Sequence, residues 1–194
     1  MEHRTAQLER KTTETQIKVE LNLDGKGSYD VATGVGFLDH MLAHLSKHSG
    51  IDLNIQACGD THIDDHHTVE DVGICIGQCF EKALGDKRGI VRYGNSSVPM
   101  EDALANVAVD ISGRPFCVYN ADYPSDKIGA FDVELIEEFL RAFTNSCRIN
   151  LHVNVPYGTN SHHIAEGVFK ALGRSIGQAV KVKGDQIPST KGVL

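Results

Sequence analysis

The chain has 194 residues, 41% of them hydrophobic and 23% charged, and its formal net charge of −7 argues against a general nucleic-acid binder. No apolar run approaches the ~20 residues of a membrane span, and the N-terminus lacks the apolar region of a secretory signal. Five cysteines without a Cys-x-x-Cys pair support neither a disulfide framework nor a zinc–thiolate site, so we expect a reduced, cytoplasmic protein.

The first half of the chain alternates between strand-type and helix-type hydrophobic patterns. Residues 17–23 alternate apolar and polar side chains, which is the period of a half-buried strand. Gly50 follows a stretch of helical spacing and is a typical helix stop. We predict, in order, an edge strand over 4–10, a strand over 17–23, a turn over 24–27, a return strand over 29–33 that completes a hairpin, a helix over 37–49 and a strand over 51–57.

The second half repeats this order. We predict strands over 91–98, 103–111 and 116–123, a helix over 135–143, a strand over 149–155 and a final helix. Two copies of one small unit, each with a sheet face to cover, pack most simply with helices against helices and sheets outside. We therefore expect an α+β fold of two pseudo-symmetric halves, each a four-stranded sheet with two helices, in one compact catalytic unit. The first half-repeat spans 1–90, and the second spans 91–194 and includes a C-terminal substrate-binding tail.

A His-His-x-x-Glu motif occurs once in each half, and all three residues recur at one constant offset. An apolar run follows both copies and indicates a helix with the histidine pair on its first turn. Asp65 and Ser161 are the expected N-caps, and Gly85 is the expected stop of the first of these helices. The motif comprises His66, His67 and Glu70 in the first half and His162, His163 and Glu166 in the second.

Such a turn is suited to metal chemistry. Adjacent histidines diverge by about 100° around a helix, so one ion cannot comfortably bind both. The glutamate shares a face with either histidine, so the turn fits two metals, or one metal and a second partner. Four imidazoles and two carboxylates without thiolate fit Mn, Fe, Co or Zn and lie outside the all-oxygen preference of Ca and Mg. A single histidine pair is usually a surface or capping feature, but this exact repetition favours metal.

The first predicted helix of each half offers one more candidate ligand. His40 stands at the start of the helix over 37–49, and alignment of the two halves places Glu138 opposite it. Both are ligand types, although spacing alone does not decide whether they bind metal. His44 and His48 continue the stripe of His40, and we interpret them as surface residues near a helix C-terminus.

Cationic residues outside the histidine motifs are candidates for anion binding. Arg92 and Arg114 lie at predicted strand ends or turns, where arginine is most often solvated but can also bind an anion with two hydrogen bonds. The tail over 184–194 is either a frayed terminus or a glycine-flanked loop in which Ser189 and Lys191 hold a phosphate.

Four stretches of the sequence, in this order, resemble the imidazoleglycerol-phosphate dehydratase family of histidine biosynthesis. They are Gly34 to Leu42, Asp65 to Asp71, Ser161 to Glu166 and Pro188 to Gly192. The likeness covers nearly the whole chain, and four separate motifs make it highly specific. The resemblance implies a hydro-lyase that converts D-erythro-imidazole-glycerol phosphate into imidazole-acetol phosphate and water.

The resemblance also implies a cofactor, an assembly and a set of site residues. The family uses two Mn²⁺ ions per site, and its members form a closed shell of roughly 24 chains with sites between subunits. Glu14 and Glu166 are the catalytic candidates. By position, the metal ligands are His40, His66, His67, Glu70, Glu138, His162, His163 and Glu166, where Glu138 replaces a histidine of many relatives. The substrate contacts are Glu14, Arg92, Arg114, Ser189 and Lys191.

The chemistry explains these residue types. The hydrogen removed from the substrate lies on a carbon without a neighbouring carbonyl, so it is poorly acidic. A metal-bound imidazolate ring can supply the electrons that expel the adjoining hydroxyl, and a carboxylate then takes the next proton. Two other classes remain on the sequence alone, namely a metal-dependent hydrolase and a non-catalytic metal-binding shell protein. Product detection after addition of imidazole-glycerol phosphate separates all three.

Overall fold

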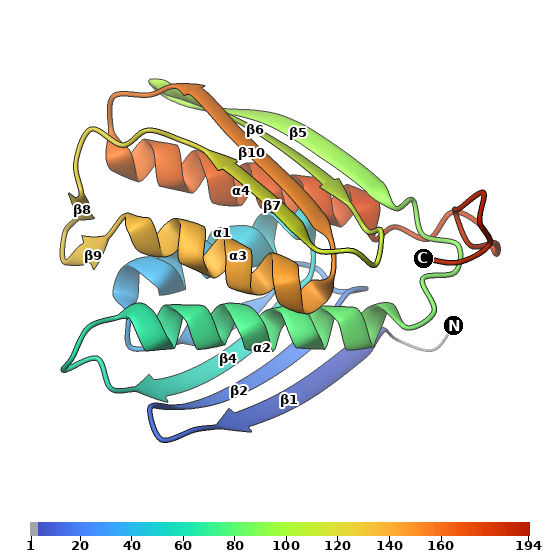
Figure 1. Cartoon of the computed structure of the whole chain (residues 1–194), viewed down its shortest axis with the longest axis horizontal. Helices are drawn as coiled ribbons and strands as arrows, with labels where there is room; N and C mark the ends of the chain where they lie inside the picture. Colours follow the sequence, from blue (N-terminus) through green and yellow to red (C-terminus); the bar gives the residue numbers. More distant parts are fainter. Residues whose placement is uncertain (1–3) are drawn as a thin grey trace.

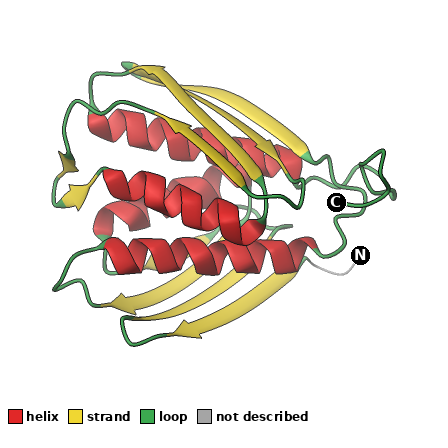
Figure 2. Cartoon of the chain, in the orientation of Figure 1, coloured by secondary structure: helices red, strands yellow, loops and turns green. Residues whose placement is uncertain are grey.

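The computed structural model of the chain describes residues 4–194. Two four-stranded sheets form the outer layers, and the α-helices of this part of the chain lie between them (Figures 1 and 2). This arrangement confirms the expected α+β fold with helices enclosed by two sheets. No helix within residues 4–194 combines the length and apolarity needed to cross a bilayer.

The strands of the first sheet stand in the order β1 (Thr5–Lys11), β2 (Thr15–Asn22), β4 (Asp52–Gly59) and β3 (Tyr29–Ala32). The inward side chains of β2 are buried because alternate residues of a strand point to one face. The predicted hairpin with residues 29–33 is wrong, because β3 pairs in parallel with β4 and not with β2. The more apolar β4 takes the central place, and the short, exposed β3 takes the edge. The helices of the first half are α1 (Gly36–Ser49), which lies between β3 and β4 in the chain, and α2 (His66–Leu84), which follows β4.

The second sheet repeats this topology with the order β5 (Tyr93–Met100), β6 (Ala103–Asp110), β10 (Asn150–Tyr157) and β7 (Phe116–Asn120). In it, β7 pairs in parallel with β10. A small hairpin, β8 (Lys127–Ile128) with β9 (Phe131–Asp132), precedes the third helix. It was not predicted, because two-residue strands leave no periodicity to detect. The helices of the second half are α3 (Glu134–Cys147), which precedes β10, and α4 (Ser161–Ala179), which follows it.

Glycines let the helices of the two halves pack closely, α2 on α3 and α1 on α4. A Cβ atom at Gly77 would lie 2.7 Å from the Phe143 carbonyl oxygen, and one at Gly177 would lie 2.5 Å from that of Ser49. Larger residues would therefore force the helices apart. The close approach holds the first turn of α1 near the first turn of α4, where the candidate site lies.

The N-cap of α2 is Asp65, as predicted, whereas that of α4 is one residue earlier than predicted. Asp65 stands at the N-cap of α2 but makes no capping bond there, and Asp64 Oδ1 instead accepts the N–H of His66 at 2.9 Å. Ser161 is the first helical residue of α4, and Asn160 is its N-cap. The Asn160 side chain accepts the N–H groups of both motif histidines. The histidine pairs thus lie on first turns, as predicted.

Candidate active site

The second histidine motif meets the first turn of α1. His162 Nε2 lies 3.1 Å from Glu166 Oε2, and His40 Nε2 lies 3.4 Å from the same oxygen. The ligand atoms of these three residues all lie within 4.8 Å of one another. Two imidazole nitrogens and one carboxylate oxygen are a donor set for a transition metal. Glu166 is buried, but the histidine side chains are 42–46% exposed, so other ligands can approach.

Two further residues from the same helices surround Glu166. Lys170 Nζ lies 2.5 Å from Glu166 Oε1, and His44 Nε2 lies 3.5 Å from it. Burial raises the pKa of Glu166, but the Lys170 hydrogen bond and the neighbouring histidines outweigh it and hold the pKa at about 2. Burial lowers the pKa of His44 to about 4. The interpretation of His44 as a surface residue is wrong, because α4 covers it. Its i, i+4 spacing from His40 was the available signal.

The first histidine motif has a different neighbour. His67 Nε2 lies 3.9 Å from Glu14 Oε1, and its other ring nitrogen, Nδ1, lies 3.1 and 3.2 Å from the two Asp60 carboxylate oxygens. The Asp60 hydrogen bond raises the pKa of His67. Glu14 lies in the turn between β1 and β2, and its carbonyl accepts the Asp60 N–H at 3.1 Å. The fold therefore brings Glu14 to the histidine motif across a separation of about fifty residues in sequence.

The second histidine of the other motif has a matching partner. His163 Nδ1 lies 2.5 Å from Asp102 Oδ1, in the turn between β5 and β6. This hydrogen bond raises the pKa of His163 and, with bonds from Thr159, holds the pKa of Asp102 well below its ordinary value. Sequence reasoning missed both aspartates, since neither recurs at the offset of the motif.

The other predicted ligands are not gathered within one chain. Across residues 4–194, the His40, His162 and Glu166 group stands alone as a set of three or more ligand-type side chains with such short separations. Glu138 is half-buried on α3, which packs on α2, the helix that carries His66 and Glu70. No hydrogen bond or ion pair joins these three side chains, so their metal binding stays a prediction.

The candidate phosphate-binding residues lie around the C-terminal tail. Arg92 donates from Nε and Nη2 to Asp110 at 2.7 and 3.1 Å, and from Nη1 to the Pro188 carbonyl oxygen at 3.0 Å. The side chain of Arg92 thus orders the tail that carries Ser189 and the exposed Lys191. Arg114 is also exposed. The preceding residue, Gly113, abuts the C-terminal residue, because a Cβ there would lie 2.9 Å from Leu194.

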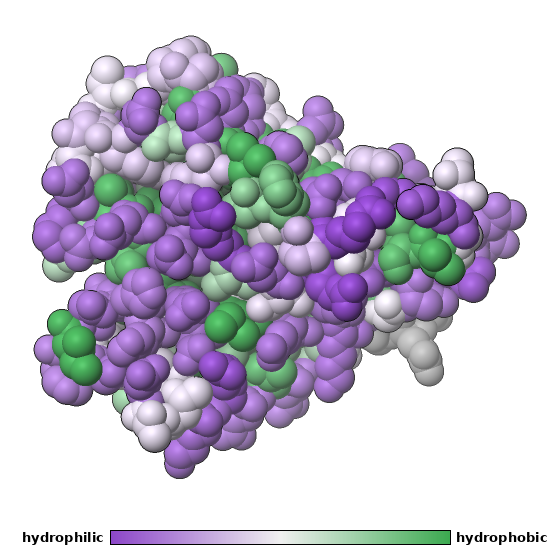
Figure 3. All heavy atoms as spheres, viewed as in Figure 1, coloured by the Kyte–Doolittle hydropathy of each residue, from purple (hydrophilic) through white to green (hydrophobic). Residues whose placement is uncertain are grey.

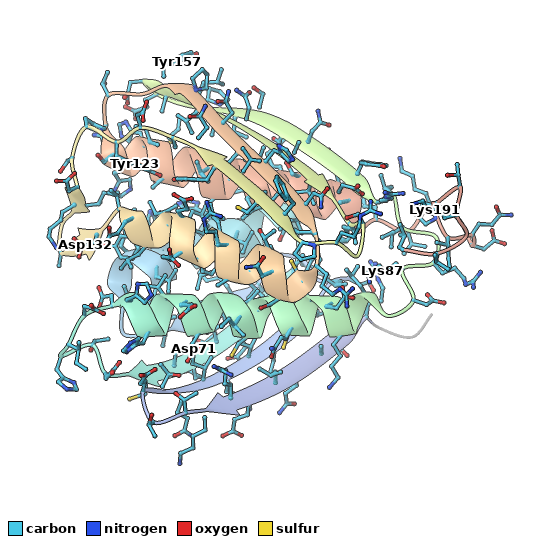
Figure 4. The ribbon with its side chains drawn as sticks, in the orientation of Figure 1. Asp71, Lys87, Tyr123, Asp132, Tyr157 and Lys191 are labelled. Carbon is cyan, nitrogen blue, oxygen red and sulfur yellow. The ribbon has the colours of Figure 1, made fainter. Side chains whose placement is uncertain are left out.

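The candidate metal ligands and the C-terminal tail lie at opposite ends of the molecule. All of α4 separates them, and its 19 residues are roughly 28 Å long at the rise of an α-helix. Figure 4 labels Lys191 at the tail and Asp132 at the end where α2, α3 and α4 begin. Figure 3 shows a predominantly hydrophilic surface on this face, with smaller apolar spots.

Comparison with known proteins adds a second line of evidence. The family model for imidazoleglycerol-phosphate dehydratase matches residues 33–176. The chain belongs to this family. It is therefore a hydro-lyase of histidine biosynthesis, as the sequence motifs predicted. The match spans both histidine motifs, the residues between them, which include Arg92 and Glu138, and His40 ahead of the first motif.

Individual members of the family are similar to this chain over nearly its whole length. The imidazoleglycerol-phosphate dehydratase of Ruegeria pomeroyi is 58% identical over 98% of this chain and all of the relative, and that of Desulforamulus reducens is 58% identical over all of both. The crystal structure of the Staphylococcus aureus enzyme has a TM-score of 0.85 at 42% identity, covering 92% of this chain and 99% of that one. The Pyrococcus furiosus structure has a TM-score of 0.84 at 35% identity, covering 96% and 100%.

Proposed function

We propose that the chain dehydrates D-erythro-imidazole-glycerol phosphate to imidazole-acetol phosphate at a site that is shared between copies of the chain. The separation of metal ligands and tail carries this proposal. In the substrate only a short glycerol chain joins the imidazole ring to the phosphate. One chain cannot hold both ends, because roughly 28 Å of α4 lies between the two groups of residues. A closed homo-oligomer, such as a shell of roughly 24 copies, would bring them together.

The metal is Mn²⁺ in this proposal, with two ions at each site. The observed group of His40, His162 and Glu166 fits one such ion by its donor atoms and its exposure. Bound Mn²⁺ would polarise the substrate imidazole and favour its deprotonated form. The remaining ligands would be His66, His67, Glu70, Glu138 and His163, some of them supplied by a neighbouring copy.

Glu14 is the proposed proton-transfer residue. Its side chain is 51% exposed, and Oε1 faces His67 Nε2 at 3.9 Å without a hydrogen bond that would occupy it. The oxygens of Glu166, by contrast, already contact His162 and Lys170. Glu14 Oε1 is thus the freer base to accept a substrate proton and return it to a later intermediate. Glu166 stays a second candidate for this role.

The tail would bind the substrate phosphate. Arg114 and Lys191 are exposed cations, and Ser189 adds a hydroxyl beside them. Arg92 already donates to Asp110 and to the tail, so it would set the position of the tail and give its remaining N–H groups to phosphate. Each charge-assisted contact is worth about 1.5–3 kcal/mol. The place of the reaction in amino-acid biosynthesis supports a cytoplasmic location.

Subunit mixing tests the shared site. One variant carries His162→Ala with His163→Ala, and a second carries Ser189→Ala with Lys191→Ala. Each alone should be inactive when the ketone product is followed by NMR. Doubly tagged particles purified after co-expression should regain activity, because some sites combine an intact metal turn with an intact tail from another copy.

The control for the mixing experiment uses two variants that are altered in the same helical turn. Co-expressed His162→Ala and Glu166→Ala chains should stay inactive, because these residues contact each other within a chain. If the tail and metal-turn variants fail to complement while the particles contain both, the site lies within one copy. Release of inorganic phosphate by the unmodified enzyme, without ketone, would indicate a hydrolase instead.

A further inference from the structure

Each histidine motif has an aspartate on the same atom of its second histidine. Asp60 contacts Nδ1 of His67, and Asp102 contacts Nδ1 of His163. Both rings are less than 35% exposed. Within residues 4–194, no hydrogen bond occupies Nε2 of either ring, although Glu14 faces that of His67. The two rings thus have the same orientation relative to a carboxylate.

The aspartates come from unrelated places in the two half-repeats. Asp60 lies between β4 and α2, six residues before its own motif begins, whereas Asp102 lies in the turn between β5 and β6. Duplication of one ancestral contact does not account for this, because the two positions do not correspond. The two halves form the same contact from different positions in the chain. This indicates that the second histidine of each motif needs a carboxylate at Nδ1.

A carboxylate on Nδ1 controls the form of the ring. An ionised carboxylate only accepts hydrogen bonds, so Nδ1 carries the proton and the lone pair remains on Nε2. A histidine metal ligand commonly donates its other N–H to such a partner, which orients the ring and raises its basicity. We propose that Asp60 and Asp102 are positioning residues that direct Nε2 of His67 and His163 toward the metal. This proposal rests on the assignment of both histidines as ligands.

Asp102 provides a direct test because its two oxygens have separate tasks. Oδ1 accepts from His163, while Oδ2 accepts from Thr159 N at 2.6 Å, Thr159 Oγ1 at 2.8 Å and Asn160 N at 2.9 Å. An asparagine can keep its oxygen toward the loop and turn its NH₂ toward the ring. The NH₂ would then donate to Nδ1, move the ring proton to Nε2 and block the metal-binding lone pair.

A purely structural role for Asp102 predicts a different outcome. If Asp102 only holds the loop before α4, Asp102→Asn should behave like the unmodified protein, and Thr159→Val should be the more harmful change. If Asp102 positions His163, the order is reversed. Thr159→Val removes one bond to Oδ2 and leaves the Oδ1 contact with the ring, so it is the matched control.

The experiment measures Mn²⁺ binding to metal-free full-length protein by the EPR signal of the unbound ion. Asp102→Asn and Asp60→Asn should each weaken the affected sites about tenfold to a hundredfold. Thr159→Val should bind like the unmodified protein, and the melting temperatures of all metal-free variants should agree closely. Unchanged binding in Asp102→Asn, with weakened binding in His163→Ala, would overturn this proposal and leave the metal site intact. Unchanged binding in His163→Ala would overturn the ligand assignment itself.

Discussion

Replacement of Gly177 by alanine should loosen the contact between α1 and α4. An added Cβ would lie 2.5 Å from the Ser49 carbonyl oxygen, against at least 3.4 Å for ordinary van der Waals contact. The helices must then separate by about 0.9 Å or bend, since the clashing atom belongs to the backbone. Helix propensity alone would favour alanine by up to ~1 kcal/mol, but we expect overpacking to prevail with a net loss of about 1–3 kcal/mol.

Gly167 on the same helix is the matched control. A Cβ there would lie 3.5 Å from the Cβ atoms of Ala105 and Met100, so it fits. Gly167→Ala should therefore stabilise the chain by roughly 0.5–1 kcal/mol through its backbone effect. Both variants replace glycine by alanine in α4. Opposite signs of their changes in unfolding free energy would therefore report the close approach of α1 and α4.

The assay is thermal unfolding of metal-free protein at one fixed concentration, because the proposed assembly would make stability concentration-dependent. For a chain of this length, each kcal/mol shifts the melting temperature by about 2–4 °C. Gly177→Ala should also weaken Mn²⁺ binding, because displacement of α1 moves His40 away from Glu166. A melting temperature equal to or above that of the unmodified protein would refute the role of this close approach.

Three further predictions concern the metal and the proton. Complete removal of metal by a chelator should abolish activity and reduce the particle size in light scattering, because ligands from several copies would couple metal binding to assembly. An unchanged particle size would show that assembly does not depend on metal. Glu138→Ala should lose part of its bound metal in elemental analysis while keeping its circular dichroism spectrum, and full occupancy would remove Glu138 from the ligand set. Glu14→Gln should lower turnover by roughly 10²–10⁴-fold with little change in metal content, whereas a rate near that of the unmodified enzyme would make Glu166 the better base.

Much of the fold followed from short-range patterns. The strand pattern over residues 17–23 and the helical pattern over 37–49 needed no tertiary information, because each depends on the period with which side chains face a core. The predicted hairpin over residues 17–33 was wrong because strand pairing does depend on tertiary information. A periodic pattern identifies a strand but not the strand it pairs with. The chain passes from β3 through α1 to β4, and β4 then lies between β2 and β3 in the sheet.

The sequence by itself determined the chemical character of this protein. A repeated motif of histidine and glutamate on helical first turns predicts metal ligands, since the spacing and the donor atoms are local properties of the helix. The resemblance to the family followed from these motifs together with residues 34–42 and 188–192. Such a motif does not indicate how far apart its two copies lie in the folded protein.

Only the tertiary structure decided which of these residues meet. Packing of α1 on α4 through glycine contacts joined His40 to Glu166 and covered His44. Loops with no shared spacing brought Asp60 and Asp102 to the two histidine rings. The length of α4 placed the tail at the far end from the candidate metal ligands. Contacts between distant segments depend on how whole elements pack, and no local period encodes them.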